Sequence, residues 1–137
     1  MKEVIAFDAA DVAAVARRLD PHGWVNLHPD VAADDVPPDG GGFFGIFSAR
    51  GPLIPLCTWH PGERSAGLQH ATGPKVARRI DIPAGWRVVQ DHPRRGLVLR
   101  VPAGVADEDV LRWLVDVGRS VCPVPMRDQW IAELHQP

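Results

Sequence analysis

The chain has 137 residues, 45% of them hydrophobic, and a net charge of -2 at pH 7, which predicts one globular domain over residues 1–137 with a single core. No uncharged apolar run approaches the roughly 18 residues that a membrane-spanning helix needs, and the N-terminus lacks the cationic start and apolar run of a secretory signal. We therefore expect no membrane partner and a cytoplasmic location, where a disulfide between Cys57 and Cys122 is disfavoured.

The first third of the chain is predicted to form a helix, a strand and a long loop. The segment "DAADVAAVARRLD" has apolar residues at helical spacing and is followed by Pro21, which predicts an amphipathic helix over 8–20. "GWVNLH" alternates in polarity over 23–28 and predicts a strand. The acidic segment 29–42, rich in proline and glycine, predicts a loop.

The remaining elements are predicted from turn residues and apolar spacing. "FFGIFSA" (43–49) and "PLIPLCTW" (52–59) predict two strands joined by a turn, and Pro74 after Gly73 predicts the start of a short helix. Further along are a predicted hairpin over 85–102, a helix over 106–121 with an acidic first turn, and a last helix over 127–135.

This order of elements, αβββαββαα, indicates an α+β fold. The turns between neighbouring strands are too short for parallel crossovers. We therefore expect a largely antiparallel five-stranded sheet with the helices on one face.

Charge is distributed unevenly along the chain. Residues 1–40 carry 3 Lys/Arg and 8 Asp/Glu, residues 41–105 carry 9 and 3, and residues 106–137 carry 3 and 6. The basic middle is either neutralised by the acidic flanks within the fold or available to an anionic ligand or an acidic partner. The excess of 13 Arg over 2 Lys is typical of a GC-rich bacterial genome.

The predicted hairpin contains a polar tip, "QDHPRRG", at residues 90–96. With "HPRR" as the loop, Arg87 lies directly opposite Arg100, and Asp91 lies opposite Gly96 on the same side. Two opposed arginines are destabilising unless a negative charge is close.

Three explanations of these arginines stay open: simple solvation, an internal acid, either Asp91 or one of Asp34, Asp35 and Asp39 in the acidic loop, or an exogenous anion. Arg94 and Arg95 at the tip extend the basic patch, and His92 adjusts its charge.

Reactive side chains elsewhere in the sequence suggest an alternative. Cys57 with His60 and His70 supports nucleophilic chemistry if folding brings them together, and Asp91 with His92 supports acid-base chemistry. The "CTWHPGERSAGLQH" segment lacks the tight paired spacing of structural zinc sites, so no metal and no cofactor is predicted. Of the five tryptophans, Trp24 and Trp59 are assigned neither to the core nor to a stacking surface.

Two resemblances bear on these residues. At "GWRVVQDHPRRGLVLRVP", with "GLQHATGPK" upstream and a tryptophan-containing helix downstream, residues 43–121 resemble small actinobacterial proteins. This resemblance implies no reaction and no catalytic residues. The order of elements is similar to the secretion-chaperone-like fold, whose members generally dimerise and bind protein segments.

The sequence therefore favours a small cytoplasmic, chaperone-like binding or adaptor domain over an enzyme. It is expected to bind a partner protein or a small anionic ligand through a sheet that carries Arg87, Arg100, Arg94 and Arg95, with Asp91 and His92 beside them. A homodimer is expected as well. Specific nucleic-acid binding is disfavoured, because the chain is acidic overall and contains no recognisable nucleic-acid-binding module.

Overall fold

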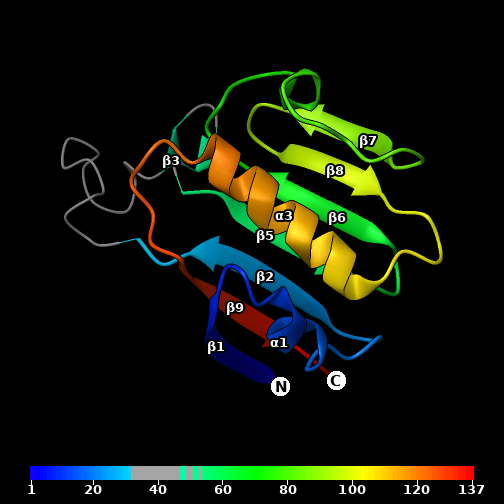
Figure 1. The fold of residues 1–137 in the computed structure, drawn as a ribbon. Coiled ribbons are helices and arrows are strands. Elements are labelled where there is room, and N and C mark those ends of the chain that lie inside the picture. Colours follow the sequence, from blue (N-terminus) through cyan, green and yellow to red (C-terminus); the bar gives the residue numbers. More distant parts are fainter. Residues whose placement is uncertain (32–46, 49–50, 53) are drawn as a thin grey trace.

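The computed structural model describes residues 1–31, 47–48, 51–52 and 54–137, and within them an antiparallel sheet backed by helices (Figure 1). Its strands in chain order are β1 (Lys2–Asp8), β2 (Trp24–Pro29), β5 (Leu56–His60), β6 (Ser65–Gln69), β7 (Arg87–His92), β8 (Gly96–Arg100) and β9 (Gln129–His135). They form a seven-stranded sheet in the order β1-β9-β2-β5-β6-β8-β7. A separate two-stranded ribbon pairs β3 (Phe47–Ser48) with β4 (Gly51–Pro52).

One face of the sheet is covered by α3 (Asp107–Val121), which crosses it at the centre, and by α1 (Val12–Ala16) (Figure 1). We call this the helix face. The strands alternate buried and more exposed residues, because successive side chains point to opposite faces. Trp59 and Trp130, both fully buried, lie on the helix face and form the centre of the core with Leu111 and Leu114 of α3.

The α+β class and the antiparallel sheet agree with the sequence prediction, but the number and order of strands do not. The sheet has seven strands rather than five. Residues 2–7, to which no element was assigned, form β1 together with Asp8, which was expected in the first helix. Residues 65–69, also without an assigned element, form β6, and residues 129–135, expected within the last helix, form β9. In β9 the buried residues are Trp130, Ala132 and Leu134, a period of two that packs one face of a strand and not one stripe of a helix.

Both predicted N-terminal and central helices are shorter than expected. The first spans Val12–Ala16 rather than 8–20. Residues expected to form the second contain only a three-residue 3-10 turn, η3 (Val76–Arg78), preceded by Lys75 with a φ of 60°. Since a left-handed residue cannot continue a helix, Pro74 does not begin one.

Two further predictions fall mainly outside the described residues. The loop predicted over 29–42 overlaps β2 at Pro29, and its residues 32–42 are not described. Of the strand predicted over 43–49, only residues 47–48 are described, and they form β3. Across the described ranges, no helix combines the length and the apolar character needed to cross a membrane.

Candidate functional site

The β7–β8 hairpin confirms the opposition of two arginines and corrects the rest of the predicted register. Arg87 pairs with Arg100, as expected from the sequence. A bulge then shifts the strands, so that Gln90 pairs with Val98 and Asp91 with Leu97. Because one inserted residue changes which face the following side chains occupy, the residues after the bulge exchange faces relative to the prediction.

Asp91 therefore does not neutralise Arg87 and Arg100. It shares the helix face with its buried partner Leu97, and its Oδ2 accepts a hydrogen bond of 3.2 Å from the N–H of Ala77. The two arginines point to the opposite face, where both are exposed. The explanation in which Asp91 is their internal acid is wrong, and the other candidate acids, Asp34, Asp35 and Asp39, lie outside the described residues.

His92 organises the tip of the hairpin. Its Nδ1 accepts hydrogen bonds from the backbone N–H groups of Arg94 at 3.0 Å and Arg95 at 3.1 Å. The side-chain amide of Gln90 donates to the carbonyl of Arg95 at 3.2 Å. The backbone of Arg95 is thus held from both sides, and since His92 and Asp91 belong to opposite faces, they do not form an acid-base pair.

The face opposite α3, which we call the open face, carries a row of polar and aromatic side chains across all seven strands. Its members are connected by strand pairing and, between Trp24 and His60, by ring stacking; in the order of the sheet they are Lys2, His135, Trp24, His60, Ser65, Arg100 and Arg87. Strands lie about 4.8 Å apart, so the row is roughly 29 Å long. No described helix packs over it.

Trp24 lies in the middle of this row, between two imidazoles. Its indole stacks on His135, with ring centroids 3.8 Å apart and planes 5° apart, and on His60 at 5.3 Å and 22°. Both aromatic faces of Trp24 are therefore covered from within the chain. A base or sugar needs a free aromatic face for stacking, so Trp24 does not provide such a platform.

Trp59, the other unassigned tryptophan, belongs to the core. It is fully buried on the helix face, and its Nε1 donates a 2.9 Å hydrogen bond to Oδ1 of Asp107 at the start of α3. The guanidinium of Arg64 lies 5.0 Å from the indole centroid.

Beside the polar row, the open face is hollowed at Gly67. Gly67 lies between Thr58 and Val98 on the neighbouring strands, and all three residues line a cavity of about 220 Å³. The side chains that can donate hydrogen bonds around it are those of His60, Ser65, Gln69 and Arg95. The hydroxyl of Thr58 is directed elsewhere, because it donates to Asn26 Oδ1 at 2.7 Å.

Gly67 is not required by the backbone conformation. A Cβ built there would meet its nearest atoms, Leu97 O and Thr58 Cβ, at 3.8 and 4.0 Å, which is ordinary contact. Gly96, on the adjacent strand, is different, since its φ is 85° and a Cβ would collide with the carbonyl of Leu68. The glycine at position 67 thus leaves space rather than relieving strain.

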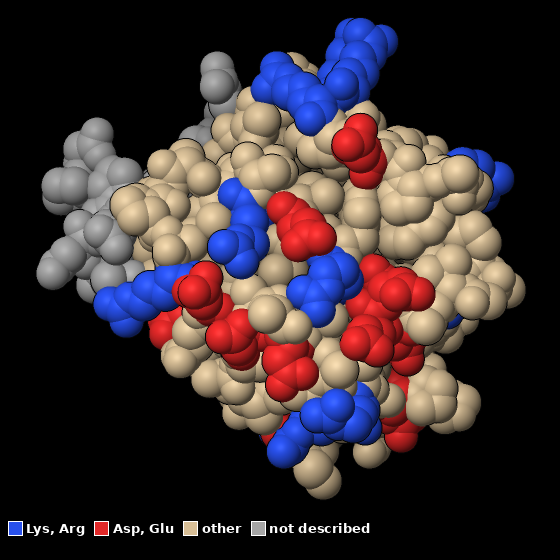
Figure 2. Space-filling model, viewed as in Figure 1, with Lys and Arg blue, Asp and Glu red and all other residues tan. Residues whose placement is uncertain are grey.

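The half of the open face around this cavity has basic but no acidic strand residues. The carboxylates on open-face positions of the sheet are Asp8 in β1 and Glu133 in β9, and Glu133 lies 3.9 Å from Lys2. Over β6, β8 and β7 the charged positions are Arg87 and Arg100, with Arg95 at the tip. The helix side differs, because acidic and basic side chains are interspersed there (Figure 2).

Cys57, His60 and His70 do not form a nucleophilic site in this structure. Cys57 is fully buried on the helix face, its Sγ lies 3.4 Å from the carbonyl of Leu114, and burial raises the pKa of its thiol to about 12. His60 points to the open face. Since the thiolate is the reactive form, Cys57 is inert in the folded chain. Among the described residues, no group of His, Cys, Asp and Glu could hold a metal ion.

His70 has a charged neighbour, Asp91, that is distant from it in the sequence. It is 1% exposed, and burial lowers its pKa, opposed by the charge of Asp91 and assisted by Arg79. Its Nδ1 accepts the N–H of Thr72 at 3.1 Å, whereas His70 Nε2 and Asp91 Oδ1 are buried without a hydrogen-bond partner in the described structure. The bulge in β7 brings this pair to one face, and no sequence pattern indicates a bulge there.

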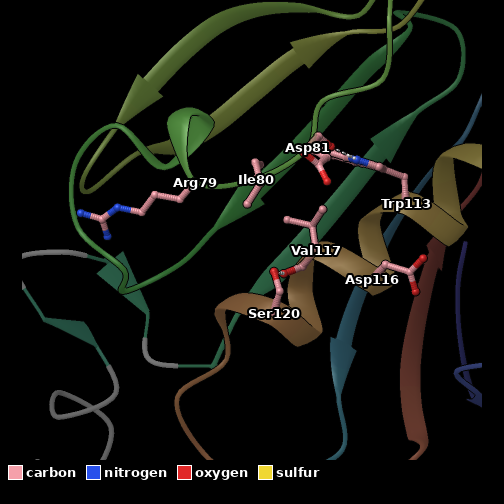
Figure 3. Close-up of a pocket in the computed structure, with 7 residues that line it drawn as sticks. All are labelled: Arg79, Ile80, Asp81, Trp113, Asp116, Val117 and Ser120. Atoms are coloured by element: carbon pink, nitrogen blue, oxygen red, sulfur yellow. Dashed lines mark hydrogen bonds between the residues drawn. The ribbon is translucent and has the colours of Figure 1, made fainter.

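A second hollow, of about 400 Å³, lies between α3 and the segment that follows η3 (Figure 3). Ile80 and Val117 line it together with Trp113, whose Nε1 donates to the carbonyl of Asp81 at 2.9 Å. Arg79 also lines it, but its side chain extends away from the other lining residues (Figure 3). The charged groups do not converge on a common point, so we assign no chemistry to this hollow.

Comparison with known proteins adds no assignment, since no family model, no curated protein and no solved structure matches the chain.

Proposed function

We propose that this chain is a small binding domain that takes an anionic group into the cavity over Gly67 on the open face. The observation that carries the proposal is the combination of a cavity of about 220 Å³ with hydrogen-bond donors on its rim and no carboxylate among the strand residues of that half of the face. An anion is the ligand for which such a surface is complementary.

Arg95 is the principal charged contact in this proposal. Its backbone is fixed by His92 and Gln90, so its guanidinium is presented from an ordered tip and can hold a carboxylate or phosphate in a bidentate manner. Arg100 is the cross-strand neighbour of Ser65 on the rim, and Arg87 lies opposite Arg100. Together they add long-range attraction for the same charge.

The size of the cavity limits what enters it. Its volume of about 220 Å³ is below the roughly 300–1,000 Å³ of sites that enclose a whole drug-sized ligand. It suits a single carboxylate or phosphate group, supplied either by a free small anion or by a side chain of a partner protein. The remainder of the open face accommodates the rest of a protein segment.

An NMR titration tests the proposal and distinguishes the two sources. Inorganic phosphate and a short glutamate peptide are added separately, and amide shifts are mapped. Shifts centred on Gly67, Gln69 and Arg95 are expected with at least one of them. Shifts with phosphate alone indicate that the ligand is a free anion. Shifts with the peptide alone indicate that the ligand is an acidic protein segment.

Arg95→Gln is expected to weaken binding by at least about 10-fold, as for loss of a charge-assisted hydrogen bond. Arg94→Gln removes the same charge one residue away, does not line the cavity, and serves as the matched control. Shifts confined to other parts of the chain, or equal losses in the two variants, reject the proposal.

A further inference from the structure

The two edges of the seven-stranded sheet differ in how they are protected. The β7 edge is interrupted by a bulge between Val88 and Gln90, and bulges discourage pairing with another strand. The β1 edge pairs with β9 over seven consecutive residues without a register shift, and it contains no proline. Its Val4 is 55% exposed. A long, regular and partly apolar edge of this kind is a template for another strand.

The backbone groups that β1 directs outward follow from the hydrogen bonds at its two ends. The N–H of Gln136 donates to the carbonyl of Met1 at 2.9 Å, and the N–H of Ala9 donates to the carbonyl of Asp128 at 2.7 Å. Antiparallel strands alternate residues that bond to one neighbour with residues that bond to the other. The intervening even-numbered residues therefore direct their N–H and C=O groups to the edge: Lys2, Val4, Ala6 and Asp8.

One of these groups already has a partner. The carbonyl of Asp8 accepts a 2.8 Å hydrogen bond from the N–H of Asp11. Within the part of the chain that the structure describes, the edge N–H groups of Val4, Ala6 and Asp8 and the carbonyls of Lys2, Val4 and Ala6 make no hydrogen bond to the protein. Donors and acceptors thus alternate along the strand, as a second antiparallel strand requires.

We propose that β1 pairs antiparallel with β1 of a second copy of this chain, about a two-fold axis at Ile5. This register places Lys2 opposite Asp8 of the second copy, and Val4 opposite Ala6 of the second copy. The two Val4–Ala6 pairs exchange hydrogen bonds in both directions, and each Asp8 N–H reaches a Lys2 carbonyl.

Charge selects this register over its neighbours. Moving the axis by one residue, to Val4 or to Ala6, preserves the face of every side chain but removes the opposition of Lys2 and Asp8. With the axis at Val4, Lys2 faces Ala6 of the second copy. With the axis at Ala6, Asp8 faces Val4 of the second copy. Opposite charges on directly facing strands are stabilising, so only the axis at Ile5 satisfies both ends of β1.

The resulting dimer is closed and has its open faces on the same side. Even-numbered residues of β1 belong to the open face in both copies, so the two sheets continue into one and both helix layers lie behind it. A two-fold contact uses the same edge of each copy and leaves no free β1 edge. The inference does not depend on the anion-binding proposal, since the cavity at Gly67 lies on strands remote from β1.

Mass measurement in solution tests the dimer. Light scattering after size exclusion, over a concentration series up to about 0.5 mM, where weak association becomes visible, is expected to approach twice the chain mass of 15.0 kDa. Val4→Lys introduces a charge of the kind that guards natural edges, and we expect it to raise the dissociation constant at least about 10-fold. Val89→Lys is the matched control, because Val89 is 48% exposed at the other edge.

Lys2→Glu provides an independent variant, since it places two acids opposite each other and is also expected to weaken the dimer. Hydrogen exchange adds a local readout, in which the Ala6 amide is expected to exchange at least about 10-fold more slowly in the wild type than in Val4→Lys. A monomeric wild type, an open-ended oligomer, a Val4→Lys variant that stays dimeric, or dissociation by Val89→Lys overturns the proposal.

Discussion

Replacing Gly67 with alanine is expected to stabilise the protein, against the usual effect of a substitution inside a sheet. Glycine in a strand is destabilising by roughly 0.5–1 kcal/mol relative to alanine, because its unfolded chain has more conformational freedom. The structure shows no steric clash that would oppose this gain in stability, since the added Cβ would lie 3.8 Å from Leu97 O and 4.0 Å from Thr58 Cβ. The full gain of about 0.5–1 kcal/mol should therefore appear.

Thermal and urea unfolding measure this gain. The melting temperature is expected to rise by about 2–4 °C for a domain of this size, and the urea midpoint to rise with an unchanged slope. Gly96→Ala is the comparison, because its φ of 85° and the adjacent Leu68 carbonyl predict a clear loss. If Gly67→Ala lowers stability by more than about 0.5 kcal/mol, position 67 is under strain and the cavity is not the reason for the glycine.

Three further predictions address the core. Gly118→Ala is expected to lose up to about 2 kcal/mol in urea unfolding: its Cβ would lie 2.9 Å from Cη2 of the fully buried Trp130, and overpacking of about 1–3 kcal/mol is offset in part by the helix-propensity gain of about 1 kcal/mol. Improved stability would contradict this packing. Burial raises the pKa of the Cys57 thiol to about 12. In a Cys122→Ser variant, Cys57 is therefore expected to resist alkylation by iodoacetamide at pH 8 and to react once urea unfolds the chain. Alkylation of the native protein would disprove the burial of Cys57. Burial lowers the pKa of His70 from 6.5, so the imidazole binds its proton more tightly in the unfolded chain than in the folded one. The contribution of His70 to stability is therefore complete above pH 6.5 and is lost as the pH falls below 6.5. His70→Asn, which keeps an acceptor for Thr72, should reduce the slope of stability against pH between about 7 and 5, and an identical slope in both proteins would exclude His70 as its source.

The elements with an unambiguous local signal were predictable from the sequence. Residues 106–121 combine an acidic first turn with an apolar stripe, and the structure has α3 over Asp107–Val121. The hairpin over 85–102 is present as β7 and β8, and the first two pairs of its register are correct. The opposition of Arg87 and Arg100 depends only on those two pairs, which explains why this part of the site could be anticipated.

The missed elements have ambiguous local patterns. In β9, Trp130, Ile131 and Leu134 fit a helical stripe as well as Trp130, Ala132 and Leu134 fit a strand. Only the presence of β1 and β2 on either side decides between them, because they supply the hydrogen bonds that a strand needs. Contacts between the first and last residues of the chain leave no signal in either segment alone.

The sequence by itself determined the α+β class, the amphipathic α3, the basic central hairpin and the opposed arginines, since each depends on spacing within a short segment. The tertiary structure decided the strand count, the bulge that sends Asp91 to the helix face, and the cavity lined by Gly67, Thr58 and Val98. These features depend on which strands become neighbours, and that choice minimises the free energy of the whole sheet and core rather than of any one segment.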